Sequence, residues 1–224
     1  MNDFHRNAGR SPIFPSNGNM AQNGIKNNGA TASAETVSLR PAHSRNASAG
    51  PDRHAPVDCG DLPFIIRRDG TWLYRGSPIG RKSMVCLFAS VLKRNADGEF
   101  LLETPAERGR IAVEDAPFVA VGLDWSGEGR SQVLQFRTNI DQVIIAGADH
   151  PLRVAHDLLT CEPTPYLHVR AGAGGFPIEA RICRSVYYEL VALAEPGIKF
   201  GKRVLGVWSQ GRFFSLGELA TCSD

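Results

Sequence analysis

The fold is decided by the segment FIIRRDGTWLY, residues 64–74, in which an Asp-Gly pair separates two short apolar runs. Asp-Gly between residues of high β propensity is a strong local signal for a β-hairpin. The segment therefore predicts two antiparallel strands, at residues 64–66 and 72–74. It also indicates that the ordered part of the chain begins near Leu62.

The residues that follow predict a helix. Ser77 is a residue type favoured at a helix N-cap, and Pro78 suits the first helical position. Six apolar residues then recur at helical spacing on one face: Met84, Val85, Leu87, Phe88, Val91 and Leu92. We expect this helix to start at Ser77 and to end before Asn95 and Gly98.

Further along, short β-prone runs alternate with Gly, Pro and Asn, which predicts an antiparallel meander. The expected strands are residues 99–104, 111–114, 118–123, 132–139, 142–146, 166–170, 178–183, 186–193, 204–208 and 212–214. A short final helix is expected from Ser215. The predicted fold class is α+β, mostly antiparallel β, with few helices.

Two parts of the meander are similar to each other. Residues 100–104, 111–113 and 118–121 have counterparts at 166–170, 178–180 and 187–191. Such similarity favours a duplicated unit. Any two meanders also share this much pattern, so both interpretations stay open.

Residues 1–55 are rich in Asn, Ser, Ala and Gly and predict a disordered tail. They hold six Lys or Arg against three Asp or Glu, and the other residues hold 19 against 20, a net charge of −1. Because the basic surplus lies in the tail and not on a folded face, no nucleic-acid partner is expected. No apolar run approaches the roughly 18 residues that span a bilayer, and residues 1–7 lack the apolar stretch expected of a signal peptide. We therefore expect a soluble, cytoplasmic protein without membrane association.

The five cysteines are odd in number and form no C-x-x-C pair, which favours a reducing compartment. Three of the six histidines lie in the tail, and the others have no Cys or carboxylate at metal-ligand spacing. The sequence predicts no metal site, no cofactor and no catalytic residue.

The stretch GSPIGRKS, residues 76–83, is superficially similar to a phosphate-binding loop, but its glycine spacing and the position of Lys82 do not fit. A helix N-terminus beside Arg81 and Lys82 still suits an anion. The alternative is a capped helix with two solvated cations.

Two other polar groups are candidates for a site. Glu114 and Asp115 end a strand, where they suit a general base or a ribose hydroxyl acceptor, or where Asp115 stabilises a turn before Pro117. Arg137 and Asn139 close an otherwise apolar strand, where Asn139 suits either a turn or a ligand contact.

Several motifs, taken in order, resemble a known family. They are the stretches Asp69 to Ile79 and Val113 to Val121, then FRTN at 136–139, HPLRV at 150–154 and PYLHVR at 165–170. Together they resemble the proteobacterial domain-of-unknown-function family 1285 over roughly residues 62–194.

The resemblance implies a duplicated two-subdomain core, a C-terminal half loosely similar to a pleckstrin-homology (PH-like) barrel, and a ligand groove between the halves. The expected division is a tail at 1–55, an N-terminal subdomain at 62–130 and a C-terminal PH-like subdomain at 131–222.

The leading functional hypothesis is a non-catalytic signalling sensor or adaptor that binds an anionic, nucleotide-like small molecule between the halves. The candidate ligand-binding residues are Ser77, Arg81, Lys82, Glu114, Asp115, Arg137, Asn139 and Arg170. Arg81, Arg137 and Arg170 are the expected cations, because forked guanidinium groups suit phosphate. The alternatives are an enzyme that uses Glu114 or Asp115 as base on such a ligand, and a protein-interaction module.

Overall fold

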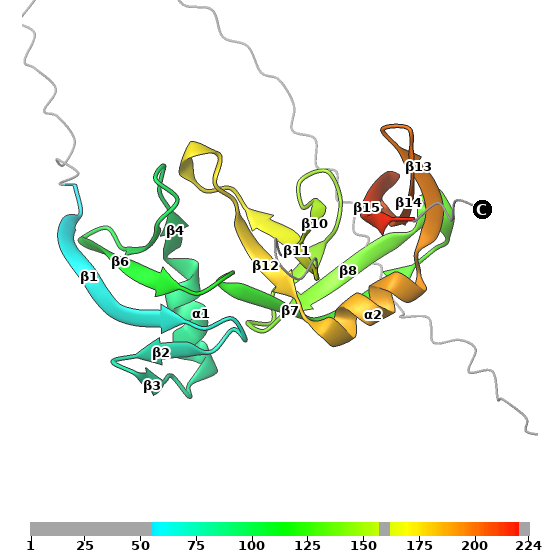
Figure 1. Ribbon diagram of the computed structural model, residues 1–224. Coiled ribbons are helices and arrows are strands. Elements are labelled where there is room, and N and C mark those ends of the chain that lie inside the picture. The colour runs from blue at the N-terminus through cyan, green and yellow to red at the C-terminus, as the bar shows by residue number, and fades with distance from the viewer. Residues whose placement is uncertain (1–54, 157–161, 220–224) are drawn as a thin grey trace, which may run out of the picture. The chain divides into compact units, whose positions relative to one another are not determined.

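The computed structural model describes residues 55–156 and 162–219 (Figure 1). The predicted tail at 1–55 lies, except for its last residue, outside the described residues. We call residues 55–116 the first half and residues 117–219 the second half.

The first half is a six-stranded sheet with one helix. In spatial order its strands are β3 (Ser77–Pro78), β2 (Trp72–Tyr74), β1 (Val57–Ile66), β6 (Glu107–Val113), β5 (Phe100–Glu103) and β4 (Leu92–Arg94). The predicted hairpin is confirmed, since Phe64 pairs with Tyr74 and Ile66 with Trp72. Helix α1 (Lys82–Ser90) packs on this sheet, with the ring of Phe88 4.9 Å from that of Phe64.

The second half contains another six-stranded sheet, which curls into a half-barrel (Figure 1). Its strands in spatial order are β10 (Leu152–His156), β11 (Pro163–Arg170), β12 (Ile178–Ile182), β7 (Phe118–Ser126), β8 (Val133–Thr138) and β9 (Val143–Ile145). Short 3-10 turns lie at Gly129–Ser131 and Ala173–Gly175. The boundary expected from the sequence, after residue 130, assigns β7 to the first subdomain. In the structure β7 is hydrogen-bonded to β8 and β12, which both belong to the second half.

The two sheets repeat the same topology. Counted along each half, the strand order is third, second, first, sixth, fifth, fourth, and the first and sixth strands form the central, parallel pair. Every other neighbouring pair is antiparallel. Strands β5 and β6 correspond to β11 and β12, as the sequence similarity suggests. Residues 187–191 have no place in the repeat, because they lie in a helix.

The second half continues beyond the repeat with α2 (Arg184–Ala192) and a small third sheet. That sheet orders β13 (Glu195–Lys199), β14 (Lys202–Ser209) and β15 (Arg212–Glu218) sequentially. The buried hydroxyl of Ser209 accepts the Leu134 N–H and donates to the carbonyl oxygen of Ala146. These bonds tie the third sheet to the half-barrel.

Three predicted elements were wrong. The helix does not start at Ser77, because Arg75 and Gly76, with φ 48° and 79°, form a two-residue turn that carries the chain into β3. It also ends earlier than predicted, at Ser90, because Leu92–Arg94 pair with β5 as strand β4. Residues 186–193 are not a strand, because Val186 and Leu190 are four residues apart and bury one helical face of α2. No helix starts at Ser215, because the chain continues as β15, whose burial alternates.

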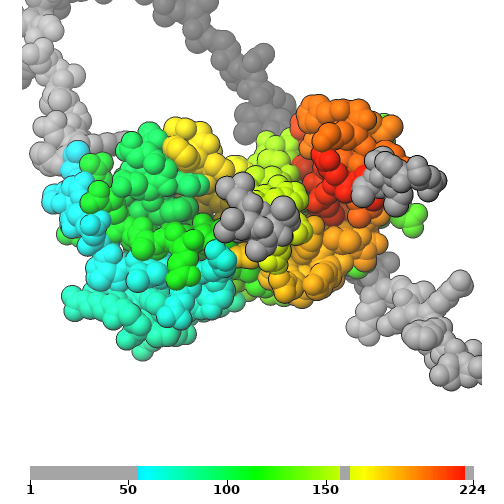
Figure 2. Space-filling view, viewed as in Figure 1, coloured from blue at the N-terminus to red at the C-terminus, as the bar shows by residue number. Residues whose placement is uncertain are grey.

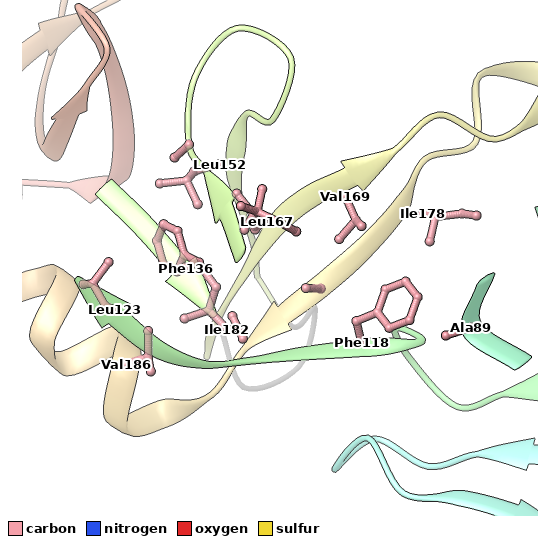
Figure 3. Close-up of a cluster of buried hydrophobic side chains, with 14 of the residues drawn as sticks. Ala89, Phe118, Leu123, Phe136, Leu152, Leu167, Val169, Ile178, Ile182 and Val186 are labelled. Atoms are coloured by element: carbon pink, nitrogen blue, oxygen red, sulfur yellow. The ribbon is translucent and has the colours of Figure 1, made fainter. Parts of the chain in front are cut away.

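One hydrophobic core cluster spans both halves. Phe136, Leu167 and Ile182 lie in the half-barrel part of the cluster, and Ala89 of α1 joins it at the end where Phe118 lies (Figure 3). The two halves therefore share buried apolar surface. Among the described helices, none combines the length and apolar character needed to cross a bilayer.

Candidate functional site

A pocket of about 400 Å³ lies between the two halves, at the C-terminal end of α1. From the first half it is lined by Ser90, Leu92, Lys93 and Arg94, and from the second by Arg170, Ala171, Gly172, Ala173 and Ile178. The pocket thus forms only where the end of α1 and β4 meet the connection between β11 and β12. We call it the inter-half pocket.

Arg170 holds the end of α1 in place. Its Nη2 donates to the carbonyl oxygens of Ala89 and Leu92, both at 2.8 Å. The last carbonyl groups of a helix lack intrahelical partners and carry partial negative charge, which favours a cation there. The guanidinium also lies 5.6 Å from the centre of the Phe118 ring, and burial lowers the pKa of Arg170.

Arg94 is held in the opposite wall of the pocket. Its Nε donates to the carbonyl oxygen of Gly98 at 3.0 Å and its Nη1 to that of Pro177 at 2.7 Å. The guanidinium lies 4.7 Å from the ring centre of Phe100 and 5.3 Å from that of Phe176. Arg94 therefore bonds to both halves and has little freedom to move.

The glycine-rich connection between β11 and β12 joins two antiparallel strands. It passes very close to β4, since a Cβ atom on Gly172 would lie 2.8 Å from the Cβ of Arg94 and 2.2 Å from the Phe176 carbonyl oxygen. Glycine at this position lets the loop close the pocket against Arg94.

The charged residues that line the inter-half pocket are all of one sign. Lys93, Arg94 and Arg170 line it, and no carboxylate is among its described lining residues. Lys93 pairs with Glu103 at 2.6 Å. In the described part of the chain, neither Arg94 nor Arg170 has a carboxylate partner, and both donate only to backbone carbonyls. Partly buried charges are normally paired, so the pocket has a surplus of positive charge.

The structure does not bring the predicted residues at the start of α1 into this pocket. Ser77 is exposed on β3, Arg81 is the N-cap residue, and Lys82 forms an ion pair with Asp141 at 2.6 Å. Arg81 and Arg170 lie at opposite ends of a nine-residue helix. At about 1.5 Å per residue the helix separates them by about 13 Å.

Glu114 and Asp115 lie at the junction of β6 and β7, where both have partners. Glu114 accepts the backbone N–H of Arg68 at 2.9 Å. Asp115 accepts the Tyr166 hydroxyl at 2.7 Å with one oxygen and Arg181 at 3.0 Å with the other. These contacts fix the orientation of the Asp115 side chain.

Arg137 and Asn139 lie at the end of β8 and in the turn after it. The Arg137 side chain covers Gly122 and is exposed. The Asn139 side chain accepts the Val119 N–H and donates to the carbonyl oxygen of Gly70, both at 3.1 Å. Asn139 therefore links the first hairpin to the half-barrel.

A second cavity, of about 800 Å³, lies along β1, β5 and β6 in the first half. Its charged lining residues are Arg75, Arg94 and Arg110 together with Asp61, Glu99 and Asp115. With both signs present, this cavity has less preference for an anion than the inter-half pocket.

Sequence reasoning named Arg170 but missed Lys93 and Arg94. The signal in the sequence was only a pair of cations just before the Asp97-Gly98 turn. Nothing local distinguishes such a pair from solvated side chains on an exposed hairpin.

Comparisons with known proteins agree with the two-part architecture. The model "Domain of unknown function (DUF1285), N-terminal domain" matches residues 51–116, and "Protein of unknown function (DUF1285), C-terminal domain" matches residues 117–216. No curated protein matches the chain.

Two crystal structures are similar to the chain. A DUF1285 family protein from Silicibacter pomeroyi DSS-3 is 44% identical over 78% of this chain and 91% of that chain, with a TM-score of 0.65. A DUF1285 family protein from Shewanella baltica OS155 is 26% identical over 58% of this chain and 91% of that chain, with a TM-score of 0.44.

Proposed function

The chain belongs to the DUF1285 family, and we propose that it is a non-catalytic binding protein that holds a small anionic ligand in the inter-half pocket. The observation that carries this proposal is the surplus of positive charge there. Arg94 and Arg170 have no carboxylate partner among the described residues, and no acid is among the described residues that line the pocket.

The ligand class follows from the chemistry of the wall. Arg170 donates through Nη2 alone, and Arg94 leaves its own Nη2 without a protein acceptor in the described part. Guanidinium donors of this kind match phosphate or carboxylate oxygens. A volume of about 400 Å³ is within the range of small-molecule sites, so a nucleotide-like or other phosphorylated molecule fits the pocket.

A sensing role is favoured over catalysis. The described lining holds no carboxylate, imidazole or thiol to act as base, and the Ser90 hydroxyl donates to the Leu87 carbonyl oxygen at 2.6 Å. Because the wall comes from both halves, a bound anion stabilises their contact and couples binding to their arrangement. Free thiols at Cys59, Cys86 and Cys183 support a reducing, cytoplasmic location as part of the same proposal.

Calorimetric titration of the full chain tests this function. A thermal-shift panel of inorganic phosphate, pyrophosphate, nucleotides and sugar phosphates first selects a ligand, which raises the melting temperature if it binds the folded state. Arg94→Lys keeps the charge but loses the fork, so it should weaken binding about tenfold. Arg81→Lys, at the other end of α1, is the matched control and should leave the affinity unchanged.

Two results would contradict the proposal. One is a panel in which no anion stabilises the full chain. The other is equal weakening by Arg81→Lys and Arg94→Lys, which would place the ligand elsewhere.

A further inference from the structure

The turn between β13 and β14 exposes large apolar side chains. Phe200 is 95% exposed and Ile198 is 78% exposed, the highest values among the large hydrophobic residues of the described part. The turn lies at the surface of the third sheet, in orange in Figure 2. Single exposed apolar residues are common, but here Phe200 forms the apex of the hairpin and Ile198 lies two positions before it on the same strand. We call residues 198–203 the hairpin tip.

The backbone conformation of the tip does not favour an aromatic residue. Lys199 pairs with Lys202, and the two residues between them, Phe200 and Gly201, have φ of 51° and 76°. A two-residue turn of this kind favours Asn or Gly at both positions, and a bulky residue with positive φ costs free energy. Since Phe200 is nearly fully exposed, packing within the described fold does not compensate for this cost.

The apolar apex is surrounded by cations. Lys199, Lys202 and Arg203 are the charged residues of the tip, which has no acid of its own. Ile198 pairs across the hairpin with Arg203, so cations flank both faces. The Lys199 Nζ lies 5.9 Å from the Phe200 ring centre, and Lys202 pairs with Glu218 at 2.7 Å. The tip thus carries three cations, one of them paired with Glu218, although residues 56–224 together carry 19 basic and 20 acidic residues.

We propose that the hairpin tip docks on the surface of an anionic lipid bilayer. Phe200, at the apex, inserts at the boundary between headgroups and acyl chains, where aromatic side chains are favoured, and Ile198 follows on the rung behind Lys199 and Lys202. Lys199, Lys202 and Arg203 then lie at the level of the lipid phosphates, whose negative charge attracts juxtamembrane cations. From the apex backwards the order is Phe200, then the Lys199–Lys202 pair, then Ile198 opposite Arg203. An aromatic apex followed by cations is complementary to a bilayer surface.

Co-sedimentation of the full chain with vesicles tests this inference. We expect binding to vesicles of phosphatidylcholine mixed with phosphatidylglycerol, little binding to phosphatidylcholine alone, and weaker binding as salt rises. Phe200→Asn should weaken partitioning by at least about tenfold, because the inserted apolar surface is lost. The same change should leave the melting temperature equal or higher, since Asn tolerates positive φ.

Matched variants separate the contributions. Lys199→Gln should weaken partitioning about fivefold, as expected for one cation near an anionic surface. Leu87→Gln, which alters a side chain 63% exposed on α1, should have no effect. Arg94→Lys in the inter-half pocket should also keep full vesicle binding, so this test is independent of the proposed ligand site.

The inference is overturned if the chain ignores anionic vesicles at low salt, or if Phe200→Asn binds them as well as the wild type does. It is also overturned if sedimentation without lipid shows self-association that Phe200→Asn abolishes, because the tip would then belong to an interface between two copies.

Discussion

Tyr166 is the centre of a polar row that crosses three strands. Arg153 and Arg181 pair with Tyr166 from β10 and β12, and the Arg153 guanidinium lies 4.3 Å from the Tyr166 ring centre. Arg153 also forms two 2.6 Å hydrogen bonds to Glu179, which raise its pKa. The Tyr166 hydroxyl donates to Asp115, so the row reaches the junction of the two halves.

Because of this environment, the stability of the protein should fall as the pH becomes alkaline. Burial, and then the hydrogen bond to Asp115, raise the pKa of Tyr166 from 10.0 to about 12. A folded-state pKa above the unfolded value gives stability that is complete below pH 10.0 and is lost as the pH rises towards about 12.

Tyr166→Phe should therefore reduce the loss of unfolding free energy that occurs at alkaline pH. Urea unfolding at a series of pH values between neutrality and pH 12 measures this. The variant should be less stable than the wild type near neutral pH, where the hydroxyl donates to Asp115, and the gap should narrow above pH 10.0. Some alkaline loss should remain, because burial also raises the pKa of Tyr187. A gap that stays constant through this range would contradict the assignment.

At the scale of the element, the β2–β3 hairpin explains why α1 starts later than predicted. Ser77 and Pro78 have the identities of a helix start, but the turn at Arg75 and Gly76 directs them back along β2. Pro78, which has no backbone N–H, is tolerated because β3 is an edge strand and no further strand needs a donor at this position. The helix then begins after Arg81, whose side chain makes no cap hydrogen bond.

The β2–β3 hairpin predicts different losses of stability for two neighbouring substitutions. Ser77→Ala should change the free energy of unfolding by less than about 0.5 kcal/mol, because Ser77 is exposed and caps no helix. Gly76→Ala should cost about 1 kcal/mol, because φ is 79° there while no atom lies within 4 Å of the added Cβ. Chemical denaturation compares the two. A larger loss of stability from Ser77→Ala than from Gly76→Ala would contradict this and would favour Ser77 as the N-cap of the helix.

At the scale of the molecule, the two halves are joined by polar contacts as well as by the continuous core. Asn139 bonds to Val119 in its own half and to Gly70 in the other, while Lys82 pairs with Asp141. With Arg170 at the end of α1, each end of the helix is thus attached to the second half. Such coupling predicts that the halves unfold together.

Asn139→Ala should lower the free energy of unfolding by about 2 kcal/mol, because the buried Val119 N–H loses its side-chain acceptor. Asn95→Ala is the control, and it should cost less, because its bonds lie in an exposed hairpin where water replaces them. Far-ultraviolet dichroism and tryptophan fluorescence, which comes from Trp72 in the first half and from Trp125 and Trp208 in the second, should report one coincident transition in the wild type. Two separated transitions would show that the halves are independent.

Local chemistry was enough to predict the first hairpin, most strands and the family. Asp69-Gly70 and Asp97-Gly98 specify turns through residues adjacent in the chain, and alternation marks the strands they join. The internal similarity also had a physical basis, since β5 with β6 and β11 with β12 occupy the same places in the two sheets. These features depend on neighbours a few residues apart.

The rest was decided by tertiary structure. The central parallel pairs, β1 with β6 and β7 with β12, join strands at opposite ends of each repeat, and no local signal encodes them. Residues 184–192 are β-prone but form a helix, because Val186 and Leu190 are buried only when that face meets the core. Likewise Arg94 and Arg170 come from different halves, so the positive pocket exists only after both sheets have folded and packed against each other.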